Sequence, residues 1–144
     1  MAILEVKNLQ AGYGKVDVLF GISFSLEPGQ SLGIVGPNGA GKSTLMKTIA
    51  GEVTTKSGSV SLQGSPITGK KPEDVVRLGL SLVPEGRQIF AGLSVTENLM
   101  LGLTGRADKS SSKQALDQMR RLFPVLDTHA DYQAGALALI GLGK

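Results

Sequence analysis

The stretch GPNGAGKST, residues 36–44, decides how this chain folds. It matches the pattern G-x-x-x-x-G-K-[ST], in which glycines let the backbone curl so that successive N–H groups point at phosphate oxygens. The apolar run 31–35 before it predicts a short buried parallel strand, and the pattern from Lys42 to Ala50 after it predicts a helix closed by Gly51. A phosphate-binding loop needs this strand–loop–helix context, so the stretch predicts nucleotide binding.

The residues of this loop have distinct expected roles. Lys42 is expected to reach the β- and γ-phosphates, and the Ser43 hydroxyl to ligate Mg²⁺. The helix that begins near Lys42 adds the positive end of its dipole. A nucleotide and Mg²⁺ are therefore the expected ligands, although the motif alone does not separate kinases, GTPases and transport ATPases. The predicted nucleotide-binding residues of the loop are Gly36, Pro37, Asn38, Gly39, Ala40, Gly41, Lys42, Ser43 and Thr44.

The composition limits the kinds of partner and chemistry. Aromatic residues make up 4% of the 144 residues and the 15 Lys and Arg are scattered, so we expect no nucleic-acid partner. The absence of cysteine excludes disulfides, Cys-ligated zinc and thiol catalysis. Glu5 interrupts the segment where a secretion signal would be apolar, and no apolar stretch reaches the length of a membrane span. Any role at a membrane is expected to come through a partner.

Hydrophobic periodicity and turn residues predict an α/β fold around the loop. The capping box S-x-x-E at 94–97 predicts the start of one helix. Further strands are expected at 2–6, at 16–26 after a Gly12-Tyr13-Gly14 turn, at 59–62 and at 80–83. The helix that begins at the capping box is expected to run to 103, and further helices are expected at 72–78 and at 112–123.

Several stretches together resemble the ABC-type ATPases. GPNGAGKST carries Asn38 and Gly39 as that family does, and Tyr13 resembles its A-loop aromatic, which stacks on adenine. SLVPEGRQIFAGLSVTENL, residues 81–99, resembles its Q-loop and the entry to its helical subdomain. The V-P-E-G-R form, and the segment 122–137, look like the second ATP-binding subunit of branched-chain amino acid importers.

The resemblance implies a P-loop NTPase fold and a place in a transporter. The chain is expected to be one incomplete ABC-type nucleotide-binding domain over 1–144. Its β-subdomain and P-loop core would span 1–92, and the start of a helical subdomain with a divergent tail would span 93–144. Glu85 would lie near Mg²⁺ and the attacking water, and residues 87–90 near a coupling helix of the membrane partner.

The expected partners are the transmembrane permease subunits and a second nucleotide-binding subunit, in a homo- or heterodimer. The expected location is cytoplasmic, peripheral on the inner face of the cell membrane. There, ATP binding and hydrolysis would energise uptake of branched-chain amino acids.

The sequence also departs from the resemblance in its last part. Family members carry a Leu-Ser-Gly-Gly signature, a Walker B strand with carboxylates and a switch histidine after the segment that ends near 137, whereas this chain reads ALALIGLGK over 136–144. The run Pro124–Asp127 is not expected to be a core strand, because of its proline and its place after a helix. His129 is expected at the surface. Phosphoryl transfer to water needs a group that orients the water, so the chain alone is expected to bind nucleotide but hydrolyse it poorly.

Other readings of the same residues stay open. The chain fits a nucleotide-binding or interaction module without catalysis, and it fits a truncated product without function. A kinase of the P-loop class would need an acceptor site and an Arg-rich lid, for which only Arg120 and Arg121 cluster.

Overall fold

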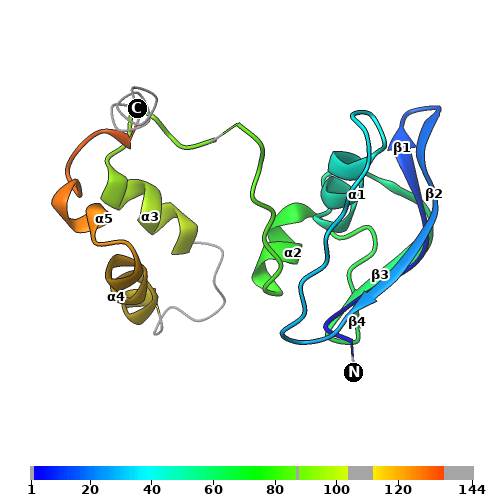
Figure 1. The fold of residues 1–144 in the computed structure, drawn as a ribbon, viewed down its shortest axis with the longest axis horizontal. Helices are drawn as coiled ribbons and strands as arrows, with labels where there is room; N and C mark the ends of the chain where they lie inside the picture. The colour runs from blue at the N-terminus through cyan, green and yellow to red at the C-terminus, as the bar shows by residue number, and fades with distance from the viewer. Residues whose placement is uncertain (1, 87, 104–111, 135–144) are drawn as a thin grey trace. The chain divides into compact units, whose positions relative to one another are not determined.

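Residues 2–86, 88–103 and 112–134 are described by a computed structural model of the chain, drawn in Figure 1. The chain divides into two units, Met1–Leu82 and Val83–Lys144. The first unit carries the phosphate-loop stretch, and the second carries the V-P-E-G-R stretch and the predicted helical segment.

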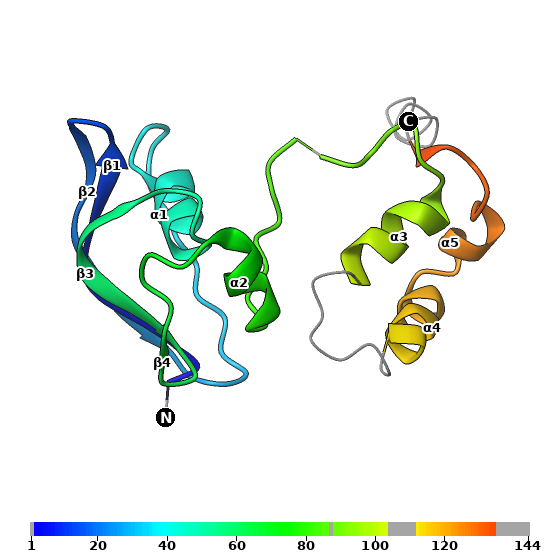
Figure 2. The ribbon, with the colours of Figure 1, turned by 180° about the vertical axis from the view of Figure 1, so that it is seen from behind.

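The first unit pairs a four-stranded antiparallel sheet with two helices among its described residues. The strand order is β2-β1-β3-β4, so β1 lies between β2 and β3. The elements are β1 (Leu4–Tyr13), β2 (Val16–Leu26), α1 (Lys42–Ile49), β3 (Thr55–Leu62), β4 (Ser65–Pro66) and α2 (Pro72–Arg77). The helices α1 and α2 lie on one face of the sheet (Figures 1 and 2).

The hairpin of β1 and β2 corrects the predicted position of one turn. Gly12 and Tyr13 belong to β1, and the turn itself is Gly14-Lys15, because Tyr13 pairs with Val16. Gly14 adopts a φ of 56°, a left-handed conformation that glycine reaches without the steric cost of a Cβ. The shift of the turn places the Tyr13 ring at the last pair of the ladder.

A single apolar cluster holds the first unit together. Val6 and Leu9 of β1 and Val75 of α2 are the largest side chains that are fully buried. Leu45 and Ile49, on one face of α1, pack into the same cluster. Apolar residues three and four apart share a helix face, so the burial of Leu45 and Ile49 orients α1 on the sheet.

Two predicted strands, of which 31–35 was expected to be parallel, are not formed, and these predictions were wrong. Residues 31–35 and 80–83 have no ladder partner, and among the described residues the sheet holds only the antiparallel strands. Val35 is 93% exposed and Val83 is 88% exposed, although both lie in apolar runs. An apolar run predicts burial, but a strand forms only where a neighbouring strand accepts its backbone hydrogen bonds.

The second unit contains three helices within its described residues, namely α3 (Val95–Leu103), α4 (Ser112–Leu122) and α5 (Val125–Thr128). The predicted capping box at the start of α3 is confirmed: the Glu97 N–H donates to Ser94 Oγ at 3.2 Å, and the Ser94 N–H donates to Glu97 Oε2 at 2.8 Å. The segment Pro124–Asp127 is not a core strand, as predicted, since most of it forms α5. The tail after Ala134 lies outside the described residues.

Backbone carbonyls of the segment 130–134 accept hydrogen bonds from the first N–H groups of α3. The Val95 N–H donates to the Tyr132 carbonyl at 3.0 Å, and the Thr96 N–H donates to the Ala130 carbonyl at 3.1 Å. A helix leaves its first N–H groups without intrahelical acceptors, so these carbonyls satisfy donors that would otherwise need water. No helix in the described ranges is long and apolar enough to cross a lipid bilayer.

The capping box makes the stability of α3 depend on pH. Hydrogen bonds from the Ser94 backbone and then its hydroxyl lower the pKa of Glu97 below 4.5. A lowered native pKa adds stability above the unfolded value, and this stability is lost as the pH falls through the native pKa. We expect the helical circular dichroism signal to fall with pH below 4.5 more steeply in the wild type than in Glu97→Gln. Identical pH profiles for the two proteins would contradict this expectation.

Candidate nucleotide-binding site

The loop 36–44 curls because two of its glycines adopt conformations that other residues rarely take. Gly39 has a φ of 86° and Gly41 a φ of 88°. Between them, the Ala40 N–H donates to the Pro37 carbonyl at 3.2 Å, which closes a turn. A Cβ on Gly36 would lie 3.2 Å from the Ala40 Cβ, so the two ends of the turn approach closely. The curled loop is the conformation predicted from the glycine pattern.

Helix α1 begins directly after the loop. Its first intrahelical bond runs from the Leu45 N–H to the Gly41 carbonyl at 2.8 Å, with Gly41 as the N-cap residue. The N–H groups before Leu45 therefore point out of the N-terminal end of the helix, where its dipole is positive. Thr44 is only 7% exposed, and its carbonyl accepts from the Thr48 hydroxyl at 2.7 Å. Thr44 thus anchors the first turn of α1 in the core.

The ammonium group of Lys42 folds back over the loop. Its Nζ donates to the Gly36 carbonyl at 2.7 Å and to the Pro37 carbonyl at 2.8 Å. The positive charge is therefore held against the loop backbone by two neutral acceptors. Phosphate oxygens are stronger acceptors for an ammonium than neutral carbonyls are, because both partners then carry charge.

The loop rests on strand β2 through Gly41. A Cβ on Gly41 would lie 3.1 Å from Val18 Cγ1 and 3.2 Å from Leu19 Cδ2. Gly41 therefore serves close packing as well as loop curvature. The sequence pattern assigned Gly41 only to the loop, and it did not predict that Val18 and Leu19 would pack against Gly41. The alternation of apolar residues over 16–26 was the only sequence feature that indicated a buried strand there.

Tyr13 lies at the same end of the first unit as the loop. It pairs with Val16, and Val18, which packs under Gly41, follows two residues later on the same strand. The β1–β2 turn and the start of α1 are accordingly at one end of the sheet (Figures 1 and 2). Tyr13 is 53% exposed, so much of its side chain is open to solvent. The predicted stacking of adenine on Tyr13 stays a prediction that this placement permits.

The predicted Q-loop residue belongs to the other unit. Glu85 lies with Gly86 in a turn of the second unit, where Gly86 has a φ of 83°. Ser43, the other predicted Mg²⁺ ligand, belongs to the first unit, and the shared metal site of the two residues stays a prediction. Arg87 lies outside the described residues. His129 is half-buried and not fully exposed, because its ring lies 5.3 Å from that of Tyr132.

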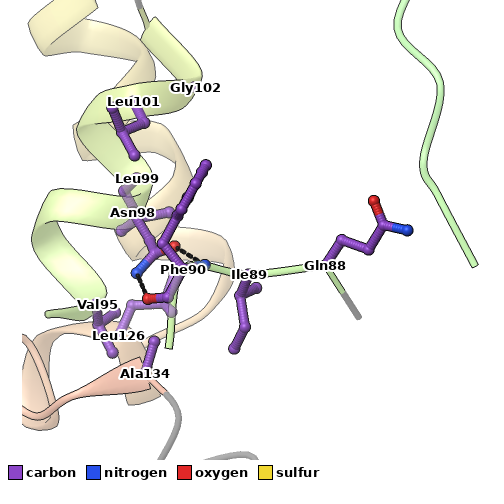
Figure 3. A pocket seen from close by; sticks show the side chains of 10 residues that line it. All are labelled: Gln88, Ile89, Phe90, Val95, Asn98, Leu99, Leu101, Gly102, Leu126 and Ala134. Carbon is purple, nitrogen blue, oxygen red and sulfur yellow. Dashed lines mark hydrogen bonds between the residues drawn. The ribbon is translucent and has the colours of Figure 1, made fainter. Parts of the chain in front are cut away.

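An apolar groove opens beside α3 in the second unit (Figure 3). We call it the α3 groove, and its volume is about 840 Å³. Two of its apolar residues are exposed, Phe90 by 63% and Ile89 by 46%. The residues that line the α3 groove are Gln88, Ile89, Phe90, Val95, Asn98, Leu99, Leu101, Gly102, Leu126 and Ala134.

The fold defines the class of protein: it is that of a P-loop NTPase of the ATP-binding cassette type. A solved ATP-binding cassette of an ABC transporter superposes with a TM-score of 0.76 at 27% identity, covering 94% of this chain and 58% of that one. Another, in an ADP conformation, superposes with a TM-score of 0.74. The family described as ABC transporter matches residues 19–139.

Curated relatives come from several transport systems. A high-affinity branched-chain amino acid transport ATP-binding protein of Pseudomonas aeruginosa is 33% identical over 94% of this chain and 58% of its own length. A probable branched-chain amino acid transport ATP-binding protein of Archaeoglobus fulgidus is 36% identical over 94% of this chain and 57% of its own length. A ribose import ATP-binding protein of Yersinia pestis is 40% identical over 69% of this chain and 20% of its own length.

These matches show that the chain belongs to the ABC transporter family, in its ATP-binding subunit branch. The chain spans less than three-fifths of the length of the branched-chain relatives it matches, 58% and 57% respectively.

Proposed function

We propose that this chain binds ATP in the loop 36–44 as part of an importer of branched-chain amino acids. The observation that carries the proposal is the Lys42 ammonium, held at 2.7 and 2.8 Å from two loop carbonyls beside the N-terminus of α1. The triphosphate would displace these carbonyls from Nζ. The Ser43 hydroxyl would hold Mg²⁺, and the Tyr13 ring would carry the adenine.

The solute class is proposed from the extent of the matches. The branched-chain relatives align over 94% of the chain, whereas the ribose relative aligns over 69%. An alignment over 94% of the chain includes nearly all of the helical segment as well as the loop core. Residues 1–144 are proposed as one ABC-type domain, with a β-subdomain and loop core in 1–92 and a helical part in 93–144.

The proposed location is the cytoplasmic face of the membrane, through contact with permease subunits. The α3 groove is the proposed contact surface, since its rim residues Ile89 and Phe90 are exposed and apolar. A short helix with an apolar face fits such a groove. A second nucleotide-binding subunit is proposed to close the ATP site.

The 144-residue chain is proposed to bind ATP without appreciable turnover. Its sequence contains no Walker B carboxylates and no signature, so Lys42 and Glu85 are its only candidates for the chemistry of hydrolysis. A nucleotide-binding module without catalysis is the second candidate function.

Isothermal titration of the 144-residue chain tests the proposal. ATP is expected to bind more tightly than adenosine, because the phosphates meet Lys42 and the helix terminus. Adding Mg²⁺ is expected to tighten ATP binding and leave adenosine unaffected. Equal affinities for ATP and adenosine would exclude the loop as a phosphate site. A phosphate-release assay on the same sample separates the candidates, since robust turnover would contradict the proposal of binding without turnover.

Replacing Tyr13 tests the adenine position separately from the phosphates. Loss of a stacking ring costs about 1–3 kcal/mol per base in other proteins, so Tyr13→Ala is expected to weaken ATP binding about tenfold or more. Inorganic tripolyphosphate, which has no base, is expected to bind Tyr13→Ala and wild type equally. Tyr13→Phe keeps the ring and is the matched control. An equal loss for ATP and tripolyphosphate would indicate that the substitution disturbs the loop itself.

A further inference from the structure

The carboxamide of Asn98 pairs with the backbone of Phe90 at the α3 groove (Figure 3). Its Oδ1 accepts from the Phe90 N–H at 2.9 Å, and its Nδ2 donates to the Phe90 carbonyl at 3.0 Å. One side chain therefore satisfies both backbone groups of Phe90, as a neighbouring strand would. Pairing with a donor and an acceptor together also defines which amide atom is the oxygen.

The same carboxamide reaches the start of its own helix. Nδ2 lies 2.9 Å from the Ser94 carbonyl and 3.4 Å from the Leu93 carbonyl. The Phe90 carbonyl also accepts from the Leu93 N–H at 3.0 Å, which closes the turn between these two residues. Asn98 thus ties the turn that carries Phe90 to the first turn of α3.

The hydrogen bonds of Asn98 hold the backbone of a residue whose apolar side chain, Phe90, is exposed. Phe90 is 63% exposed, so little packing holds its ring in place. Fixing the backbone of a loop residue removes conformational freedom that would otherwise be lost when a partner binds. The hydrogen bonds of Asn98 are the described contacts that fix the Phe90 backbone from outside its own turn.

We propose that Asn98 is a positioning residue that presents Phe90 at the mouth of the α3 groove. The proposal rests on the α3 groove being the partner-binding surface. Asn98 acts through Phe90. Position 98 requires a side chain of this length that carries both a hydrogen-bond acceptor and a donor. Aspartate keeps the acceptor for the Phe90 N–H but has no donor for the Phe90 carbonyl.

Hydrogen exchange at the Phe90 amide in the isolated chain tests this assignment. Asn98→Ala removes the acceptor, and exchange at Phe90 is expected to accelerate about tenfold, the effect of losing hydrogen bonds of ordinary strength. Asn98→Asp keeps the acceptor and is expected to accelerate it less. Ser94→Ala is the matched control, because it removes the hydroxyl bonds of the capping box and leaves the Phe90 contacts of Asn98 in place.

A single tryptophan gives a second readout at the same place. The chain contains no tryptophan, so Phe90→Trp introduces a unique fluorophore. With Asn98→Ala added, the anisotropy of this tryptophan is expected to fall and its quenching by acrylamide to rise. With Ser94→Ala added, both are expected to stay close to the Phe90→Trp values. If Ser94→Ala changes exchange and anisotropy as much as Asn98→Ala does, Asn98 only caps the helix and the proposal is overturned.

These measurements use no partner and no nucleotide. Failure of ATP binding or of permease contact would therefore leave the exchange result standing. Unchanged exchange at Phe90 in Asn98→Ala would overturn the positioning role and leave the proposed function untouched.

Discussion

Replacing Lys42 with alanine is expected to weaken ATP binding by at least about tenfold. The ammonium already lies against the loop, 2.7 Å from the Gly36 carbonyl, and bound phosphate would take over its hydrogen bonds. A hydrogen bond to a charged group contributes about 1.5–3 kcal/mol, which corresponds to roughly 10- to 100-fold in affinity. Isothermal titration with ATP and Mg²⁺ measures the change.

Lys47→Ala is the matched control for this variant. Lys47 lies in the last turn of the same helix and carries the same charge, but it is at the opposite end of α1 from the loop. Its removal changes the net charge equally and is expected to change the affinity less than about twofold, because exposed charges at a distance are screened by salt. Equal losses in the two variants would mean that general electrostatics, and not the loop, attracts ATP.

Replacing Gly12 with alanine is expected to open the end of the β1–β2 hairpin. A Cβ at this position would lie against the Val16 carbonyl oxygen at a separation no real contact allows, and 2.9 Å from the Asp17 Cα. Backbone atoms of a paired strand cannot give way as a flexible side chain does, so the ladder must shift. Overpacking of this kind costs about 1–3 kcal/mol. Hydrogen exchange of the amides near the turn, and chemical denaturation, measure it.

The same substitution is expected to reduce ATP affinity through Tyr13. Gly12 immediately precedes Tyr13, and Val16 is the pairing partner of Tyr13, so the clash is expected to displace Tyr13 at the end of the ladder. Gly14→Asn is the control, because a Cβ there meets open space and asparagine tolerates the φ of 56° better than most residues. If Gly14→Asn proves as damaging as Gly12→Ala, the turn conformation and not the clash explains the loss.

Local sequence patterns predicted the parts of this molecule that depend on neighbours along the chain. The glycines of 36–44 predicted a curled loop followed by a helix, and Gly39 and Gly41 have the left-handed backbone that such a loop needs. The S-x-x-E pattern predicted the capping box at α3. Each of these features is decided by residues within one or two turns of each other, so the sequence alone carries the information.

Features that depend on distant segments were predicted less well. The run 31–35 has the composition of a buried strand, but it forms none because no described strand lies beside it. Asn98 has no sequence pattern that marks it as a partner of Phe90, eight residues earlier. The placement of Val18 under Gly41 likewise depends on how β2 passes beneath the loop.

The sequence by itself determined a curled glycine loop, the helix after it and membership of a family of ATP-binding subunits, because backbone curvature and helix capping follow from local residue types. Only the tertiary structure decided that the Tyr13 strand and the Lys42 loop share one end of the sheet. That arrangement comes from the burial of Leu9, Leu45 and their neighbours in one apolar cluster, which joins segments that are far apart along the chain.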